Sequence, residues 1–190
     1  MDKKSALERR ERAFEAEYFN RKDAELVDKL KAVFHKKIDK QSIRDATGVT
    51  DEALLDRLVE LNLDGELMAA FNILPIVEVA WADGDVDDRE FRAVLQAAEQ
   101  HGLHPGGKAY AMLETRLREG PSRDARKLWF HYAEALRGTL GRVQLERFRK
   151  DLVETCWRIA ETSGGVLNLA FTVSANERKV IEAVERALTV

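Results

Sequence analysis

The sequence predicts an all-α protein, and three observations support this fold class. Glycine and proline are scarce, with 11 and 3 among 190 residues, so little turn chemistry is available to connect many short strands. Hydrophobic residues make up 45% and charged residues 34% of the chain, a balance typical of a globular protein with a heavily charged surface. Apolar residues recur at helical spacing in every segment outside the apolar stretch 166–171.

Residues 1–40 are predicted to form an N-terminal helical arm. The segment has a thin apolar stripe, and opposite charges lie at helical spacing along it. Two interpretations follow: the arm packs one face on the main body, or it pairs with a helix of a partner protein. The apolar stripe consists of Leu7, Phe14, Tyr18, Leu26, Leu30, Val33 and Phe34.

Residues 41–64 are predicted to form a small acidic helical unit. A short helix begins at Ser42 and ends at Gly48, and a second helix opens near Thr50. This pattern imitates a helix-turn-helix, but the second helix carries four carboxylates against the single Arg57, and DNA phosphates would repel it. The sequence therefore predicts no nucleic-acid partner. The four acidic residues are Asp51, Glu52, Asp56 and Glu60.

Residues 65–190 are predicted to form a helical bundle. The segment 66–82 contains Pro75, so we expect its helix to kink there or to restart with Pro75 near the first turn. Glycines and prolines separate the later apolar helical segments. The stretch 166–171 is too apolar for a solvated connection, and we expect it to fold over the bundle and cover core residues.

One helix–helix junction in this bundle contains more carboxylates than helix capping requires. Asp87 and Glu90 fit a capping box, in which each side chain bonds a free backbone amide at the start of the next helix. The surplus carboxylates of Asp83, Asp85 and Asp88 would repel one another unless solvent or a cation intervenes. The alternative is that they serve only capping and solubility. Because oxygen ligands favour hard cations, the predicted cofactor is Ca²⁺ or Mg²⁺, held by Asp83, Asp85, Asp87, Asp88 and Glu90.

This junction also carries a family resemblance. Ala82-Asp83-Gly84, followed by Val86, Asp87 and Glu90, resembles the hallmark of the TerB-like family. That family includes the tellurite resistance protein TerB and the N-terminal domain of DnaJ-like co-chaperones. The resemblance covers roughly residues 65–190. It implies an all-helical fold of two related halves, a link to tellurite resistance and stress response, and a metal site among the acidic residues, with no enzymatic activity established for the class.

The second half of the bundle repeats the pattern without its carboxylates. Residues 159–164 correspond to residues 79–84, and residues 173–177 correspond to the start of the following helix. Ser163 stands in place of Asp83, whereas Ser174 and Ala175 stand in place of Asp87 and Asp88. If the family's metal site draws acids from both halves, the site in this chain is depleted.

Other motifs fail on their chemistry. Asp88 occupies the sixth position of a would-be EF-hand loop, where glycine is required, and Val94 occupies the twelfth, where glutamate is required. Residues 102–108 match the letters of a phosphate-binding loop. The next position of that motif is a serine or threonine whose hydroxyl binds Mg²⁺, and Ala109 has no hydroxyl. The following residues lack the paired spacing of a zinc site: His101, His104, His131 and Cys156.

The sequence therefore predicts a non-catalytic interaction or scaffold module with protein partners, including a further copy of itself as one candidate. The alternative is an enzyme or small-ligand sensor with a pocket between the bundle halves. The net charge of −3 and the lack of a long apolar stretch predict no membrane partner. A single cysteine and a charged N-terminus without a signal sequence predict a cytoplasmic location.

Overall fold

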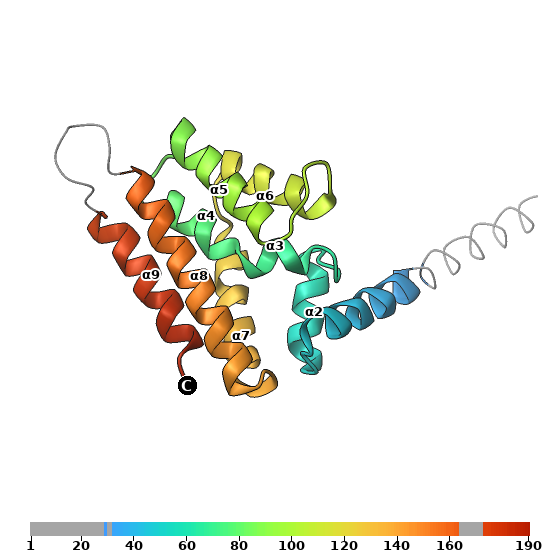
Figure 1. Cartoon of the computed structure of the whole chain (residues 1–190). Helices are drawn as coiled ribbons and strands as arrows, with labels where there is room; N and C mark the ends of the chain where they lie inside the picture. Colours follow the sequence, from blue (N-terminus) through green and yellow to red (C-terminus); the bar gives the residue numbers. More distant parts are fainter. Residues whose placement is uncertain (1–28, 30–31, 164–172) are drawn as a thin grey trace, which may run out of the picture. The chain divides into compact units, whose positions relative to one another are not determined.

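The computed structural model describes residue 29, residues 32–163 and residues 173–190 (Figure 1). Helices are the regular secondary structure throughout these residues, with no strand among them, which confirms the predicted all-α bundle. The chain divides into two compact units, residues 1–38 and residues 39–190. In the first unit, residues 32–38 are helical. The predicted cover at 166–171, and the arm's apolar residues before Val33, lie outside the described part of the chain.

The second unit is a helical bundle. It opens with helical residues 39–47 and continues through eight named helices. These helices are α2 (Glu52–Glu60), α3 (Met68–Asn72), α4 (Leu74–Ala80), α5 (Asp88–Gln100), α6 (Lys108–Glu119), α7 (Arg123–Thr139), α8 (Arg142–Ser163) and α9 (Ala175–Leu188). No helix among the residues placed by the structure is long and apolar enough to cross a membrane.

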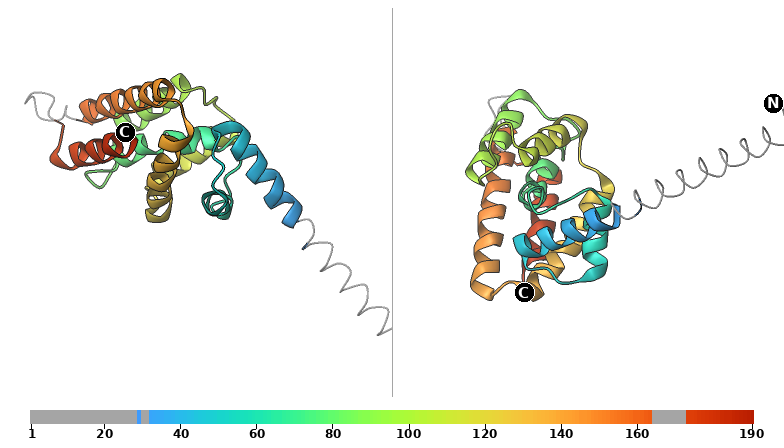
Figure 2. Two further views of the ribbon diagram at one scale, coloured as in Figure 1. Left: turned by 90° about the horizontal axis from the view of Figure 1, so that it is seen from below. Right: turned by 90° about the vertical axis from the view of Figure 1, so that its right-hand side faces the viewer.

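Helix α4 is the centre of this bundle. All 7 of its residues are buried, whereas a helix at the surface buries only one stripe. It contacts α3, α5, α6, α7, α8 and α9, and the last two run side by side (Figures 1 and 2). Pro75 lies in its first turn, after α3 has ended at Asn72, so the chain restarts its helix here. Of the two outcomes expected at Pro75, the restart is confirmed.

The segment 41–64 belongs to the same compact unit as the bundle. Asp51 caps α2, because its side chain accepts a hydrogen bond from the backbone N–H of Leu54 at 2.7 Å. Helix α2 contacts α7, which ties this segment to the bundle. The segment contributes four apolar residues that are 0% exposed: Ile43, Val49, Leu55 and Leu58.

Candidate functional site

The predicted capping box at the acidic junction is present in the structure. Asp87 is the N-cap of α5, and its Oδ1 accepts the backbone N–H groups of Arg89 at 2.7 Å and of Glu90 at 2.8 Å. In return, Oε2 of Glu90 accepts the backbone N–H of Asp87 at 2.8 Å. Two of the five predicted metal ligands are therefore bonded to amides at the start of α5.

The other three carboxylates of the junction are exposed. Oδ1 of Asp83 accepts a hydrogen bond from Oγ of Ser174 at 3.0 Å and a longer one from Nδ2 of Asn176 at 3.4 Å. Asp85 and Asp88 lie at the surface. The junction therefore meets the start of α9, where Ser174 and Glu177 form a second capping box. The α4–α5 junction and the start of α9 therefore lie next to each other, which the sequence did not predict.

Three of the five predicted metal ligands form hydrogen bonds within the protein. Within the described residues, no group of three or more histidine, cysteine, aspartate or glutamate side chains is placed to hold a metal ion. Asp83, Asp87 and Glu90 instead bond groups at two helix starts. Binding of Ca²⁺ or Mg²⁺ by the five predicted ligands stays a prediction.

Two buried carboxyl groups, one at the start of α5 and one at the start of α9, interact electrostatically. Glu90 is 6% exposed and Glu177 is 2% exposed. The pKa of Glu90 is raised to about 7, chiefly by burial and against the opposing effect of the hydrogen bond from the backbone of Asp87. The negative charges of Asp87, Glu177 and Asp85 also contribute to this rise. The capping carboxyl of α5 therefore titrates near neutral pH.

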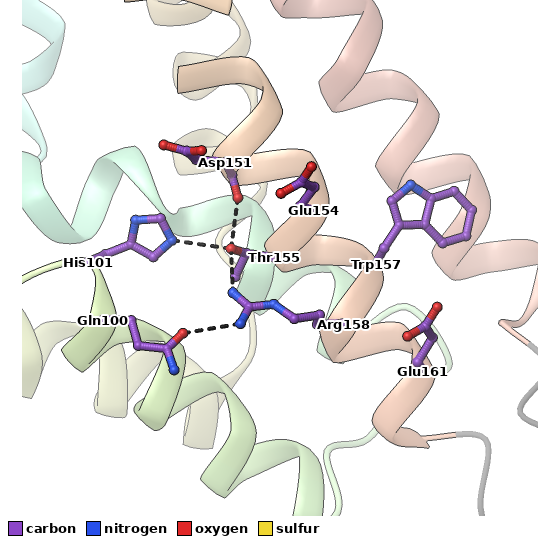
Figure 3. A pocket seen from close by; sticks show the side chains of 8 residues that line it. All are labelled: Gln100, His101, Asp151, Glu154, Thr155, Trp157, Arg158 and Glu161. Carbon is purple, nitrogen blue, oxygen red and sulfur yellow. Dashed lines mark hydrogen bonds between the residues drawn. The ribbon is translucent and has the colours of Figure 1, made fainter. Parts of the chain in front are cut away.

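A pocket of ≈ 660 Å³ lies between α5 and α8 (Figure 3). Figure 3 shows Gln100 and His101, from the end of α5, facing Thr155 and Arg158 on α8. The alternative function expected from the sequence, an enzyme or small-ligand sensor with a pocket between two bundle halves, stays a prediction. The remaining residues that line it are Asp151, Glu154, Trp157 and Glu161.

A hydrogen-bond network fixes the polar groups of this pocket. Thr155 is 2% exposed, and its hydroxyl donates its single hydrogen to the backbone carbonyl of Asp151 at 2.8 Å. The same oxygen accepts from Nη2 of Arg158 at 3.0 Å and contacts Nε2 of His101 at 3.3 Å. Nη1 of Arg158 donates to Oε1 of Gln100 at 3.2 Å. Because the shorter contact assigns the hydroxyl hydrogen to the carbonyl of Asp151, we expect His101 to donate from Nε2. Its Nδ1 is then the acceptor of the neutral ring.

We expect the His101 ring to be neutral at pH 7, with its proton on Nε2. Burial lowers its pKa from the usual value, the charge of Asp151 opposes this, and Arg158 lowers it further. Long-range ¹H–¹⁵N correlation spectra of the histidines measure both the tautomer and the titration. Thr155→Val removes the acceptor and is expected to abolish the preference for the Nε2 tautomer. A proton on Nδ1 in the wild-type protein would contradict the assignment.

The cysteine that follows Thr155 in the sequence is not available as a nucleophile in this pocket. It is not among the residues that line the pocket. The neighbouring Cys156 is 0% exposed in the core, and burial raises the pKa of its thiol to about 12. Its thiolate form is therefore negligible at neutral pH. A ligand would meet an acceptor nitrogen, a guanidinium and several carboxylates that are held by the two helices.

Comparison with protein-family models, curated proteins and solved structures finds no match for this chain. His101 has the residue type of a zinc ligand, and no sequence pattern pairs it with α8. A local signal existed, because Thr155 and Arg158 are three residues apart on a helix and share a face. Their apposition to the end of α5 depends on tertiary packing.

Proposed function

We propose that this protein is a non-catalytic interaction module, which docks on a partner protein through the apolar face of residues 32–38. The observation that carries the proposal is the exposure of three large apolar side chains on this short helical stretch. Val33, Phe34 and Ile38 are 65%, 66% and 60% exposed. Scattered apolar side chains are normal on protein surfaces, whereas a contiguous group marks an interaction site. These three residues are called the arm face below.

The helical periodicity places the arm face on one side of the helix. Phe34 and Ile38 are four residues apart and so lie one turn apart, and Val33 adjoins Phe34. Anchors with this spacing are typical of a helix that inserts its apolar side into a partner's groove or pairs with a partner's helix. Docking would also stabilise the helix, because short isolated helices are marginal in water.

Charge indicates the chemistry of the partner. Lys29, His35 and Lys37 are exposed beside the arm face. A partner segment with apolar anchors and acidic neighbours would complement both features, and opposite charges would speed their encounter. The proposed partner is therefore an acidic amphipathic segment of another protein. The single cysteine of the chain supports a cytoplasmic setting for this interaction.

Site-specific photo-crosslinking in the native cell tests the docking proposal. A photoreactive phenylalanine derivative in place of Phe34 is expected to crosslink to one partner protein, or to a small set of them. The matched control carries the same group in place of Val143, which is 83% exposed at the start of α8. Crosslinks from position 34 that match those from position 143 would contradict the proposal. So would crosslinking to lipid alone.

The proposal includes membership of the TerB-like class and a role in stress or tellurite resistance. Support comes from the Ala82-Asp83-Gly84 motif between α4 and α5, and from the paired capping boxes at the starts of α5 and α9. Calorimetry with Ca²⁺ and Mg²⁺ tests the cation that this class implies. Submillimolar binding that disappears in Asp83→Asn/Asp87→Asn would support it, and its absence would remove the cation from the proposal.

A second candidate function is sensing of a small polar ligand in the pocket between α5 and α8. The volume of ≈ 660 Å³ supports it, as do the imidazole of His101 and the guanidinium of Arg158 among the residues that line the pocket. Screening small polar fragments by NMR tests this candidate. Chemical-shift changes confined to the residues that line the pocket would support it, and an unperturbed pocket would reject it.

A further inference from the structure

A small cavity lies between α4, α7 and α9, away from the pocket and the acidic junction. Its volume is ≈ 20 Å³. Most of its wall is apolar and comes from Leu74 and Pro75 on α4, Phe130 on α7, and Val180 and Val184 on α9. Glu78 from α4 and Arg126 and Trp129 from α7 also line it and carry its polar groups.

These two side chains hold polar atoms without protein partners. Oε1 of Glu78 and Nε1 of Trp129 are buried and form no hydrogen bond with any residue that the structure describes. Both residues are more than nine-tenths buried, since Glu78 is 4% and Trp129 is 2% exposed. The other carboxylate oxygen of Glu78, Oε2, bonds and pairs with the guanidinium of Arg126. The unbonded atoms are therefore one acceptor and one donor, on two residues that line the same cavity.

Buried polar groups in native proteins nearly always have a hydrogen-bond partner, which is protein or ordered water. An indole N–H can only donate, and a carboxylate oxygen accepts. A molecule that satisfies both atoms must accept one hydrogen bond and donate another. It must also be small, because a single water needs at least about 10–15 Å³ of such space and the cavity offers little more. Water meets all of these requirements.

We propose that the cavity is a binding site for one water molecule, which accepts a hydrogen bond from Nε1 of Trp129 and donates one to Oε1 of Glu78. This water joins α4 to α7 beside the Glu78–Arg126 ion pair. It completes the hydrogen bonding of a carboxyl group on the central helix of the bundle, and it fixes the orientation of the Trp129 indole. The volume leaves no room for a larger ligand.

A high-resolution crystal structure of the full chain tests this site directly. We expect one ordered water within about 3.2 Å of both Oε1 of Glu78 and Nε1 of Trp129. A direct hydrogen bond between the two side chains would overturn the proposal. A cavity without density for a water would overturn it as well.

NMR in solution provides a second test that does not depend on crystals. The indole N–H of Trp129 is expected to show a cross-peak to a long-lived water. Trp81 is the matched control, because its Nε1 donates to the backbone carbonyl of Leu117 at 3.0 Å. Glu78→Leu fills the polar side of the cavity and is expected to abolish the Trp129 cross-peak. If this variant does not fold, the wild-type comparison decides alone: a Trp129 signal no different from that of Trp81 rejects the site.

Discussion

Replacing Glu90 by glutamine is expected to stabilise the protein at pH 8 by about 1–3 kcal/mol. In the folded protein, burial raises the pKa of Glu90 to about 7, whereas an exposed carboxyl in the unfolded chain titrates near 4.5. The folded state thus binds a proton more tightly than the unfolded state. Stability falls as the pH rises from about 4.5 to about 7 and stays low above that range. Glutamine cannot ionise, and its Oε1 can still accept the backbone N–H of Asp87.

Urea unfolding at intervals between pH 5 and pH 8 measures this effect. The wild-type free energy of unfolding is expected to decline over this range, and the Glu90→Gln curve is expected to decline less. Glu60→Gln is the control, because Glu60 is an exposed carboxylate at the end of α2 and its loss should leave the slope unchanged. Parallel curves for Glu90→Gln and the wild type would show that this carboxyl is not the titrating group.

Ile76→Ala is expected to lower the free energy of unfolding by about 2–5 kcal/mol. Ile76 is 0% exposed in the middle of α4, which contacts six other helices. The substitution removes apolar contacts and leaves a cavity that the close-packed neighbours cannot fill completely. A loss of this size is a large part of the total stability of an ordinary domain.

Equilibrium denaturation of the purified variant measures the loss. Val143→Ala provides the matched control, because Val143 is also a β-branched apolar residue but is 83% exposed. Its cost should stay within about 0.5 kcal/mol. If Ile76→Ala costs no more than Val143→Ala, then α4 is not the centre of the packed core.

Local chemistry made much of the fold predictable. The first turn of a helix leaves its backbone N–H groups unbonded, so proline is tolerated there, and a restart near Pro75 was one of the two outcomes that the sequence predicted. The three-residue spacing of Asp87 and Glu90 predicted the capping box at the start of α5, and the structure confirms it. The apolar periodicity predicted an all-helical chain, and helices are what the described residues form.

Tertiary contacts account for what the sequence did not predict. The bond from Ser174 to Asp83 joins residues 91 positions apart, and no local pattern reports such a contact. The same holds for His101 and Thr155, which are 54 positions apart. The surplus of carboxylates suggested a cation, yet the charge of Asp83 is met by hydroxyl and amide donors of α9. Periodicity also could not distinguish α4, buried on all sides, from a helix with one apolar face.

The most direct test of the docking proposal is the affinity between this protein and the partner that position 34 captures. Calorimetry should compare the wild type with the variant Val33→Ser/Phe34→Ser/Ile38→Ser. Loss of three apolar anchors is expected to weaken binding by at least about 100-fold, which corresponds to roughly 3 kcal/mol. The melting temperature of the compact unit should not change. Equal affinity of the wild type and the variant would contradict docking through the arm face.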